Sequence, residues 1–357
     1  MPRIGEVVDR IHELEKNRES TAEFLKDEDI KSIDSDVLME NCFLKETDQR
    51  VLPENFSVCG VDGGIIKKQY SGVDVVLSRA AASLFYFSGG KLDKSMTLPR
   101  NLVSPDVQYI ESPLDVRSFN LSSSFIRLHK EVSIAIKALE EEPDMLLLDG
   151  SIVPQYAERP EKGSEARKFY DELIDKYETL FEKVISGNVL LGGVIEDSRS
   201  KRYCEELAKQ DFIPEDMINV LENTRDTNML EYLMEKGQRT GVMRYAKEYE
   251  KHVVLNDIGE KGKRVKNFYL KTAKDASPIR IDFLGLDDPI ETAEKLSEKL
   301  VPLCSYSSTY GIPSVIVEAD QRAKLSEQDL KRFESRLSSV IGPMPGLKSL
   351  RRNTRPF

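Results

Sequence analysis

Regular alternation of apolar and polar residues predicts a strand over 56–62, where FSVCGVD repeats with period two and ends at Asp62. The segment 73–87 predicts a second strand. A third strand is expected over 91–98, because Ser88-Gly89-Gly90 supplies a turn before it. These three segments together predict an antiparallel meander.

The period then changes to that of a helix over 122–142, where apolar residues recur at three- and four-residue spacing. Serines at the start of this segment are expected to cap its first turn. The apolar run 145–148 is followed by Asp149-Gly150-Ser151, which predicts a buried strand that ends in a sharp turn. The expected order is therefore three strands, a helix and a fourth strand.

The later segments continue the alternation of helices and strands. We expect a helix over 164–186, a buried strand over 188–195, a polar, mostly helical lobe over 200–250, strands over 265–272 and 279–285, a helix over 289–304 opened by Pro289, and a short apolar stretch with a closing helix after 311. The chain is expected to divide into an N-terminal helical arm (1–50), a main α/β domain (51–335) with a helical insertion near 200–250, and a basic tail (336–357).

Composition restricts the function classes. The chain has 357 residues and a formal net charge of −10, so the surface as a whole repels polyanions, and any nucleic-acid site must be local. The four cysteines stand apart, which fits a reducing cytosol better than disulfides or a zinc site. No run of about 18 apolar residues suggests a membrane span, and the N-terminal segment has the pattern of a charged amphipathic helix. We therefore expect a cytoplasmic protein.

Three acids fall at corresponding places in the predicted elements. Asp62 ends the first strand, Asp149 ends the fourth strand, and Glu131 flanks the apolar face of the helix between them. Clustered carboxylates can hold two divalent metals that stabilise both the attacking and the leaving oxygen in phosphodiester hydrolysis. Carboxylates are hard oxygen ligands suited to Mg²⁺ or Mn²⁺. Taken singly, each Asp before glycine is also a common turn former, and Glu131 could be a solvated helix residue.

The motifs together resemble those of the NurA nucleases, which work beside the HerA ATPase. The resemblance rests on GVDGG (60–64), the helix from Arg127 to Glu131, LLLDGS (146–151), GVIEDSRS (193–200) and IPSVIVEADQRA (312–323).

The resemblance implies a ribonuclease H-like α/β fold, with a mixed sheet flanked by helices and helical insertions. It also implies Mn²⁺-dependent (or Mg²⁺-dependent) cleavage of DNA, with single-strand endonuclease and 5′ to 3′ exonuclease activity, in the end processing of double-strand breaks during DNA repair. It further implies a homodimer docked on a hexameric ATPase.

The resemblance assigns metal-ligand roles to Asp62, Glu131 and Asp149. Asp320 stands where family members generally carry a histidine and is expected to be a fourth ligand. Glu196 stands where they generally carry a lysine, so the charge facing a phosphate is reversed.

Basic residues near the strand ends are the candidate DNA contacts, with single-stranded or frayed ends as the preferred substrate because one phosphate must reach the metal site. These residues are Lys67, Lys68, Arg199, Lys201 and Arg202. The tail residues Lys348, Arg351, Arg352 and Arg355 are either a solvated tail or a contact to DNA or a partner.

The N-terminal helix carries an apolar stripe, which we expect to pack on the core, a second copy or an ATPase partner. Its members are Ile4, Val7, Val8, Ile11 and Leu14.

Two other function classes stay open. GVDGG followed by a strand pair also resembles the first phosphate loop of the actin-like sugar kinases, although Ile65-Ile66-Lys67-Lys68 replaces the usual Thr or Ser, and no late glycine-rich adenosine loop is evident. A non-catalytic adaptor that keeps the nuclease fold to dock an ATPase is the second alternative, and Glu196 is the residue that supports it.

Overall fold

The computed structural model describes residues 4–28, 30–48, 52–101, 104–342 and 345–348. Its centre is an eleven-stranded mixed sheet with strand order β1-β8-β10-β11-β7-β6-β2-β3-β4, while β5 pairs with β3 and β9 with β10. The strands are β1 (Leu44–Glu46), β2 (Asn55–Gln69), β3 (Asp74–Ser88), β4 (Lys91–Leu98), β5 (Asp106–Ile110), β6 (Met145–Asp149), β7 (Leu190–Ile195), β8 (Gln238–Thr240), β9 (Met243–Arg244), β10 (Val265–Leu270) and β11 (Ile279–Leu284). The α-helices are α1 (Ile4–Asp27), α2 (Val116–Ala138), α3 (Arg167–Gly187), α4 (Arg202–Ala208), α5 (Glu215–Glu222), α6 (Asp226–Leu233), α7 (Val253–Ile258), α8 (Pro289–Leu303), α9 (Ser314–Ala323) and α10 (Glu327–Ile341).

The middle of the sheet has the topology expected from the sequence. Strands β2, β3 and β4 form the antiparallel meander, α2 leads to β6, and β6 lies parallel to both β2 and β7. The resulting order β4-β3-β2-β6-β7 is that of a ribonuclease H-like core. The expected α/β architecture, a mixed sheet flanked by helices, is confirmed.

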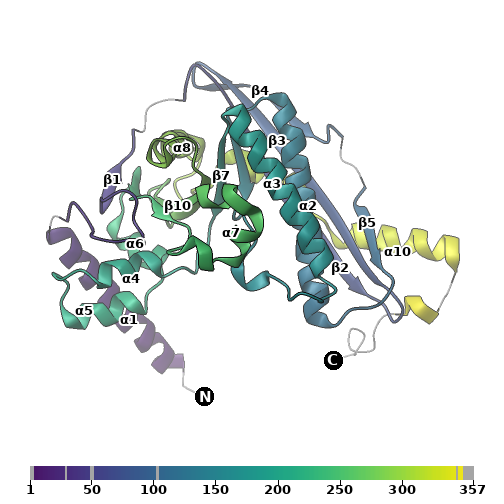
Figure 1. The fold of residues 1–357 in the computed structure, drawn as a ribbon, viewed down its shortest axis with the longest axis horizontal. Coiled ribbons are helices and arrows are strands. Elements are labelled where there is room, and N and C mark those ends of the chain that lie inside the picture. The colour runs from purple at the N-terminus through teal and green to yellow at the C-terminus, as the bar shows by residue number, and fades with distance from the viewer. Residues whose placement is uncertain (1–3, 29, 49–51, 102–103, 343–344, 349–357) are drawn as a thin grey trace.

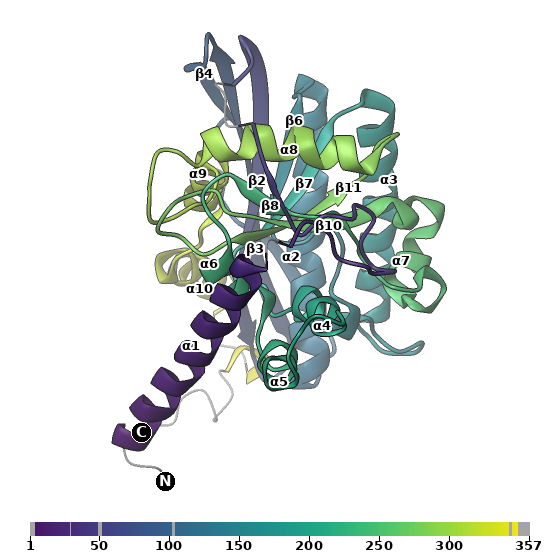
Figure 2. The same cartoon turned by 90° about the vertical axis from the view of Figure 1, so that its left-hand side faces the viewer.

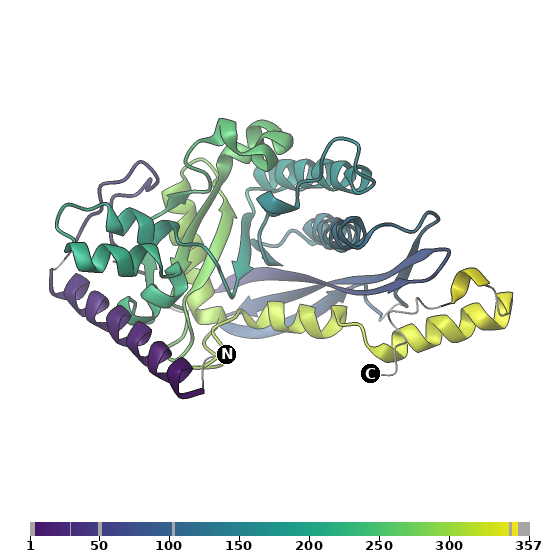
Figure 3. The ribbon, with the colours of Figure 1, turned by 90° about the horizontal axis from the view of Figure 1, so that it is seen from below.

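Helices cover both faces of this core (Figure 3). Along β6, Leu146 and Leu148 point into the core beneath α2 and α3, whereas Met145 and Leu147 point into the core beneath α8 and α9. This alternation follows from the period of two along a strand. Both faces of β6 are therefore buried, which explains its unbroken apolar sequence.

The prediction that the first strand ends at Asp62 is wrong. Strand β2 continues to Gln69, because β3 pairs with it from Asn55↔Ser88 to Gln69↔Asp74. Backbone hydrogen bonds to β3 hold Gly63 and Gly64 extended, although a glycine pair in sequence favours a turn. The expected turn after Asp149 is confirmed, since β6 ends there and Gly150 has a φ of 105°, a conformation that favours glycine.

The prediction that serines cap the long helix is also wrong. Helix α2 begins at Val116, and the Asp115 carboxylate caps it by accepting hydrogen bonds from the backbone N–H groups of Arg117 (2.9 Å) and Ser118 (3.1 Å). Ser122 and Ser123 are buried within the helix instead.

The helical lobe expected at 200–250 has a core of its own. Helices α4 to α6 bury Tyr203, Leu207 and Leu230 against Leu25 and Phe43 of the N-terminal segment. The first turns of α1 extend away from this lobe (Figure 2). No helix among the described residues is both long and apolar enough to cross a membrane.

Candidate functional site

Asp62 and Asp149 lie side by side at the point where β6 ends. The parallel register pairs Val61 with Leu148, so the next positions along the two strands are the two aspartates. Both point toward α9, since Gly60, two residues before Asp62, lies directly beneath the Val315 backbone. The two carboxyl groups are close enough for Asp62 to raise the pKa of Asp149 through charge repulsion, which adds to the effect of burial.

Two more acids approach this pair from different helices. Asp320 of α9 lies near enough to raise the pKa of both aspartates through charge repulsion. Glu131 of α2 comes from the opposite face of β2, where its side chain occupies the space that a Cβ on Gly63 would fill. The structure therefore gathers all four acids predicted as ligands around one place in the sheet.

Burial and mutual repulsion keep protons on these acids. Burial, together with repulsion from Asp62 and Asp149, raises the pKa of Glu131 to about 8, although Arg127 opposes the rise. Burial, together with repulsion from Asp62 and Glu196, likewise raises the pKa of Asp149 to about 7. Burial raises the pKa of Asp62 as well. Raised carboxyl pKa values of this kind are typical of functional sites, because like charges tolerate each other only near a cation.

Arg127 is the cation of this centre that the sequence reasoning did not single out. It forms an ion pair with Glu131 one helical turn away and lies near Asp62 and Asp149. The four-residue spacing was a usable signal, since residues i and i+4 are neighbours on a helix.

The turn after Asp149 is held from β7 and β11. The Gly150 N–H donates to the Val194 carbonyl (2.8 Å), and the Ser151 hydroxyl donates to Asp282 (2.6 Å), which also accepts from Arg280 (2.7 Å). Gly193 has no side chain where the Gly150 carbonyl passes. These contacts fix the direction of the Asp149 side chain, and no local pattern in the sequence indicates Asp282.

Glu196 lies at the rim of the centre, together with Tyr310, which the sequence reasoning also missed. Glu196 is exposed. Partial burial of the Glu196 carboxyl and repulsion from Asp197 raise the pKa of Glu196. The Tyr310 hydroxyl interacts with the same carboxyl group. Burial raises the pKa of Tyr310, and repulsion from Glu196, Asp149 and Asp320 raises it further. Tyr310 therefore links the rim to the acidic centre.

The structure separates the candidate DNA contacts into two groups. Lys67 donates to Asn120 of α2 (2.7 Å), and Lys68 pairs with Glu334 of α10 (3.6 Å). After β7, Arg199 is exposed, Lys201 donates to the Glu222 carbonyl (3.3 Å), and the half-buried Arg202 donates to the Tyr245 carbonyl. In the tail, Lys348 is described, and Arg351, Arg352 and Arg355 lie outside the described residues.

The donor set matches a divalent cation in chemistry, since four hard carboxylates repel one another and Arg127 alone offsets them. The side chains do not converge fully: among the described residues, no three His, Cys, Asp or Glu side chains are placed to enclose an ion. Glu131 approaches from the other face of β2 and pairs with Arg127.

The metal-free protein should lose stability as pH rises from about 4 to about 8. Carboxyl groups have a pKa near 4 in an unfolded chain, but Asp149 and Glu131 have folded pKa values of about 7 and about 8. The folded state thus binds more protons in this window, and the free energy of unfolding falls with pH. Thermal melts in EDTA at pH 5 and pH 8 measure this. The double variant Asp149→Asn/Glu131→Gln should show a flatter pH dependence, and an equal slope in both proteins would contradict the assignment.

The fold and this centre define the class: a ribonuclease H-like α/β protein with clustered carboxylates at the end of its central parallel strands. The NurA domain model matches residues 56–325, so the chain belongs to the NurA family.

Solved structures support the same fold. The chain is similar to the crystal structure of the NurA nuclease from Sulfolobus solfataricus, with 17% identity, a TM-score of 0.53 and coverage of 85% of this chain and 90% of that chain. It is also similar to a crystal structure of NurA (11% identity, TM-score 0.54, 98% and 100% covered) and to one of NurA with manganese (10% identity, TM-score 0.50, 94% and 98% covered). Among curated proteins, no sequence matches.

Proposed function

We propose that this protein is a metal-dependent deoxyribonuclease that hydrolyses phosphodiester bonds at the centre formed by Asp62, Glu131, Asp149 and Asp320. The observation that carries the proposal is the pairing of Asp62 and Asp149 across parallel strands, with two further acids approaching it. The manganese in one similar NurA structure and the nuclease name of another support it.

Asp62, Glu131, Asp149 and Asp320 would together hold the cation. When bound, Mn²⁺ or Mg²⁺ would lower the pKa of an attacking water and offset the charge of the phosphate. The chain itself contributes the orientation of the ligands through the Gly150 turn and a cation, Arg127, beside the developing charge.

The direct experiment is cleavage of labelled single-stranded, frayed and duplex DNA by the purified protein with Mn²⁺, Mg²⁺ or EDTA. Metal-dependent cleavage that favours single-stranded or frayed ends supports the proposal, including the endonuclease and 5′ to 3′ exonuclease activities expected for DNA end processing. Absence of cleavage under every metal condition would contradict it.

A non-catalytic adaptor is the second candidate, because Glu196 places another negative charge at the rim where a phosphate would enter. The kinase alternative has less support. Gly63 and Gly64 lie inside the β2–β3 ladder, so their backbone N–H groups do not form a phosphate loop. The hairpin turn instead lies at 70–73.

We further propose that the protein forms a homodimer and docks on a HerA-type ATPase through α1. The apolar stripe of this helix stays exposed in the single chain, from 39% at Leu14 to 85% at Ile4. An exposed stripe of this kind is typical of an interaction surface. Light scattering should give the mass of a dimer, and replacing Val7, Ile11 and Leu14 together with serine should weaken dimer formation or ATPase binding. A wild-type monomer at tens of micromolar, with no ATPase binding, would contradict the proposal.

A further inference from the structure

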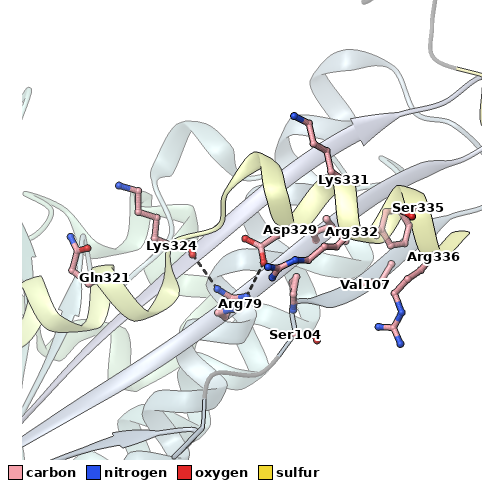
Figure 4. A pocket seen from close by; sticks show the side chains of 13 residues that line it. Arg79, Ser104, Val107, Gln321, Lys324, Asp329, Lys331, Arg332, Ser335 and Arg336 are labelled. Carbon is pink, nitrogen blue, oxygen red and sulfur yellow. Dashed lines mark hydrogen bonds and ion pairs between the residues drawn. The ribbon is translucent and has the colours of Figure 1, made fainter.

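A cavity of about 800 Å³ lies between β3, β5, the end of α9 and α10 (Figure 4). Its apolar part includes Leu77, Val107 and Phe333. Its cationic lining consists of Arg79, Lys324, Lys331, Arg332 and Arg336, and its one acidic residue is Asp329. We call this cavity the α10 groove.

The α10 groove is strongly cationic within a protein of net charge −10. Its acid is already neutralised, because Arg79 pairs with Asp329 (3.3 Å). Within the described part of the chain, the side chains of Lys331, Arg332 and Arg336 have no hydrogen bond or ion pair. Because these unpaired cationic side chains repel one another, the cluster favours an anionic ligand.

Arg79 is the buried member of this lining. Its side chain is 7% exposed, and it donates to the Lys324 carbonyl (3.1 Å) and to Asp329, whereas its Nε has no partner among the described residues. The sheet leaves space around it, because β5 pairs with β3 up to Ser78 and β4 pairs from Ala82. A buried guanidinium with an unsatisfied donor is expensive without a ligand or a bound water.

The α10 groove begins next to the acidic centre. Arg79 pairs with Gly64 across the β2–β3 ladder. Asp62 lies two residues before Gly64 in β2, on the same face of the sheet. Two residues of a strand correspond to about 7 Å along β2, so one nucleic-acid strand can reach both places. Helix α9 connects the two places, since it carries Asp320 at the centre and is followed directly by Lys324 of the groove.

We propose that the α10 groove binds the phosphodiester backbone of a nucleic-acid strand beside the bond that the acidic centre cleaves. Cleavage at the acidic centre rests on the proposed nuclease function, whereas strand binding by the groove does not. Arginine forks match phosphate oxygens, and Phe333 offers an apolar surface next to them. The groove thus supplies the local cationic surface that an acidic nuclease needs.

The test is the double variant Arg332→Gln/Arg336→Gln, whose two residues lie four positions apart on the exposed side of α10. Binding of a fluorescent 20-nucleotide single strand is measured by anisotropy in EDTA, where no metal-dependent cleavage occurs, from 20 to 200 mM salt. We expect roughly tenfold weaker binding at low salt and a log K against log salt slope shallower by about 1.4, for two lost phosphate contacts. The control is Lys162→Gln/Lys183→Gln, which removes the same charge from exposed positions before and within α3 and should bind like the wild type.

Three outcomes separate the alternatives. If the groove variant and the control bind the single strand with equal affinity and equal salt dependence, the proposed role of the groove is wrong, even if the protein cuts DNA. Full competition by submillimolar inorganic phosphate would also overturn the strand assignment, in favour of a small-anion site. Weaker binding by the groove variant without any cleavage by the wild type would support the groove and contradict the nuclease function. Circular dichroism verifies folding, and Lys324→Gln/Lys331→Gln repeats the test on other lining residues.

Discussion

Replacing Asp149 with asparagine should reduce Mn²⁺-dependent cleavage of DNA at least about a hundredfold, because even residues that only orient metal ligands contribute ten- to a hundredfold. Asparagine keeps the size of the side chain and can donate to Asp62, so the β6 turn should stay intact. The substitution also removes a negative charge that the neighbouring acids repel. The metal-free variant should therefore be at least as stable as the wild type near pH 8.

The measurement is the initial rate of cleavage of a labelled single strand at saturating Mn²⁺, together with the melting temperature in EDTA. Asp62→Asn should behave in the same way. The matched control is Asp93→Asn, the same chemical change at an exposed position of β4, which should leave the rate unchanged. If either site variant cleaves DNA at a rate near that of the wild type, the assignment of the metal centre is wrong.

Replacing Gly60 with alanine should lower the free energy of unfolding by about 3 kcal/mol, at the upper end of the range for overpacked cores. The added Cβ would lie 2.6 Å from both the carbonyl carbon and oxygen of Val315. Backbone atoms cannot rotate away, so α9 must move, and α9 carries Asp320. Urea unfolding measures the change. The control is Gly192→Ala, whose Cβ would lie 3.2 Å from the end of the Leu147 side chain and in ordinary contact with Leu296 (3.6 Å) and Ile281 (3.7 Å), and which should cost below about 1 kcal/mol.

Gly63→Ala on the same strand separates the fold from the site. The three atoms nearest to its added Cβ all belong to the Glu131 side chain, with Cγ at 2.6 Å. This variant should therefore displace Glu131 and lose cleavage activity, with a smaller loss of stability than Gly60→Ala because a side chain can rotate away. A Gly60→Ala protein as stable as the wild type would contradict the close packing of α9 on β2.

Local sequence determined the regular elements of this protein well. Alternation with period two and the Ser88-Gly89-Gly90 turn were sufficient for the β3–β4 part of the meander, and the apolar run before Asp149 was sufficient for β6. These features depend on neighbouring residues only, since each residue's side-chain direction and turn preference are local properties. Asp62, Glu131 and Asp149 could be proposed from their place in successive elements, whereas Asp320 was expected from the family resemblance.

Tertiary structure decided what the glycines and the cations do. Gly63-Gly64 has the sequence of a turn, yet fifteen pairs between β2 and β3 keep it extended, and the contacts with α2 and α9 use the missing side chains. Arg127 reaches Asp62 and Asp149, Tyr310 reaches Glu196, and Arg79 meets α10, in each case through contacts between different elements. The sequence alone determined which residue types stand along the strands and helices. Which of them face one another depended on register and helix packing, because those long-range contacts carry no local pattern.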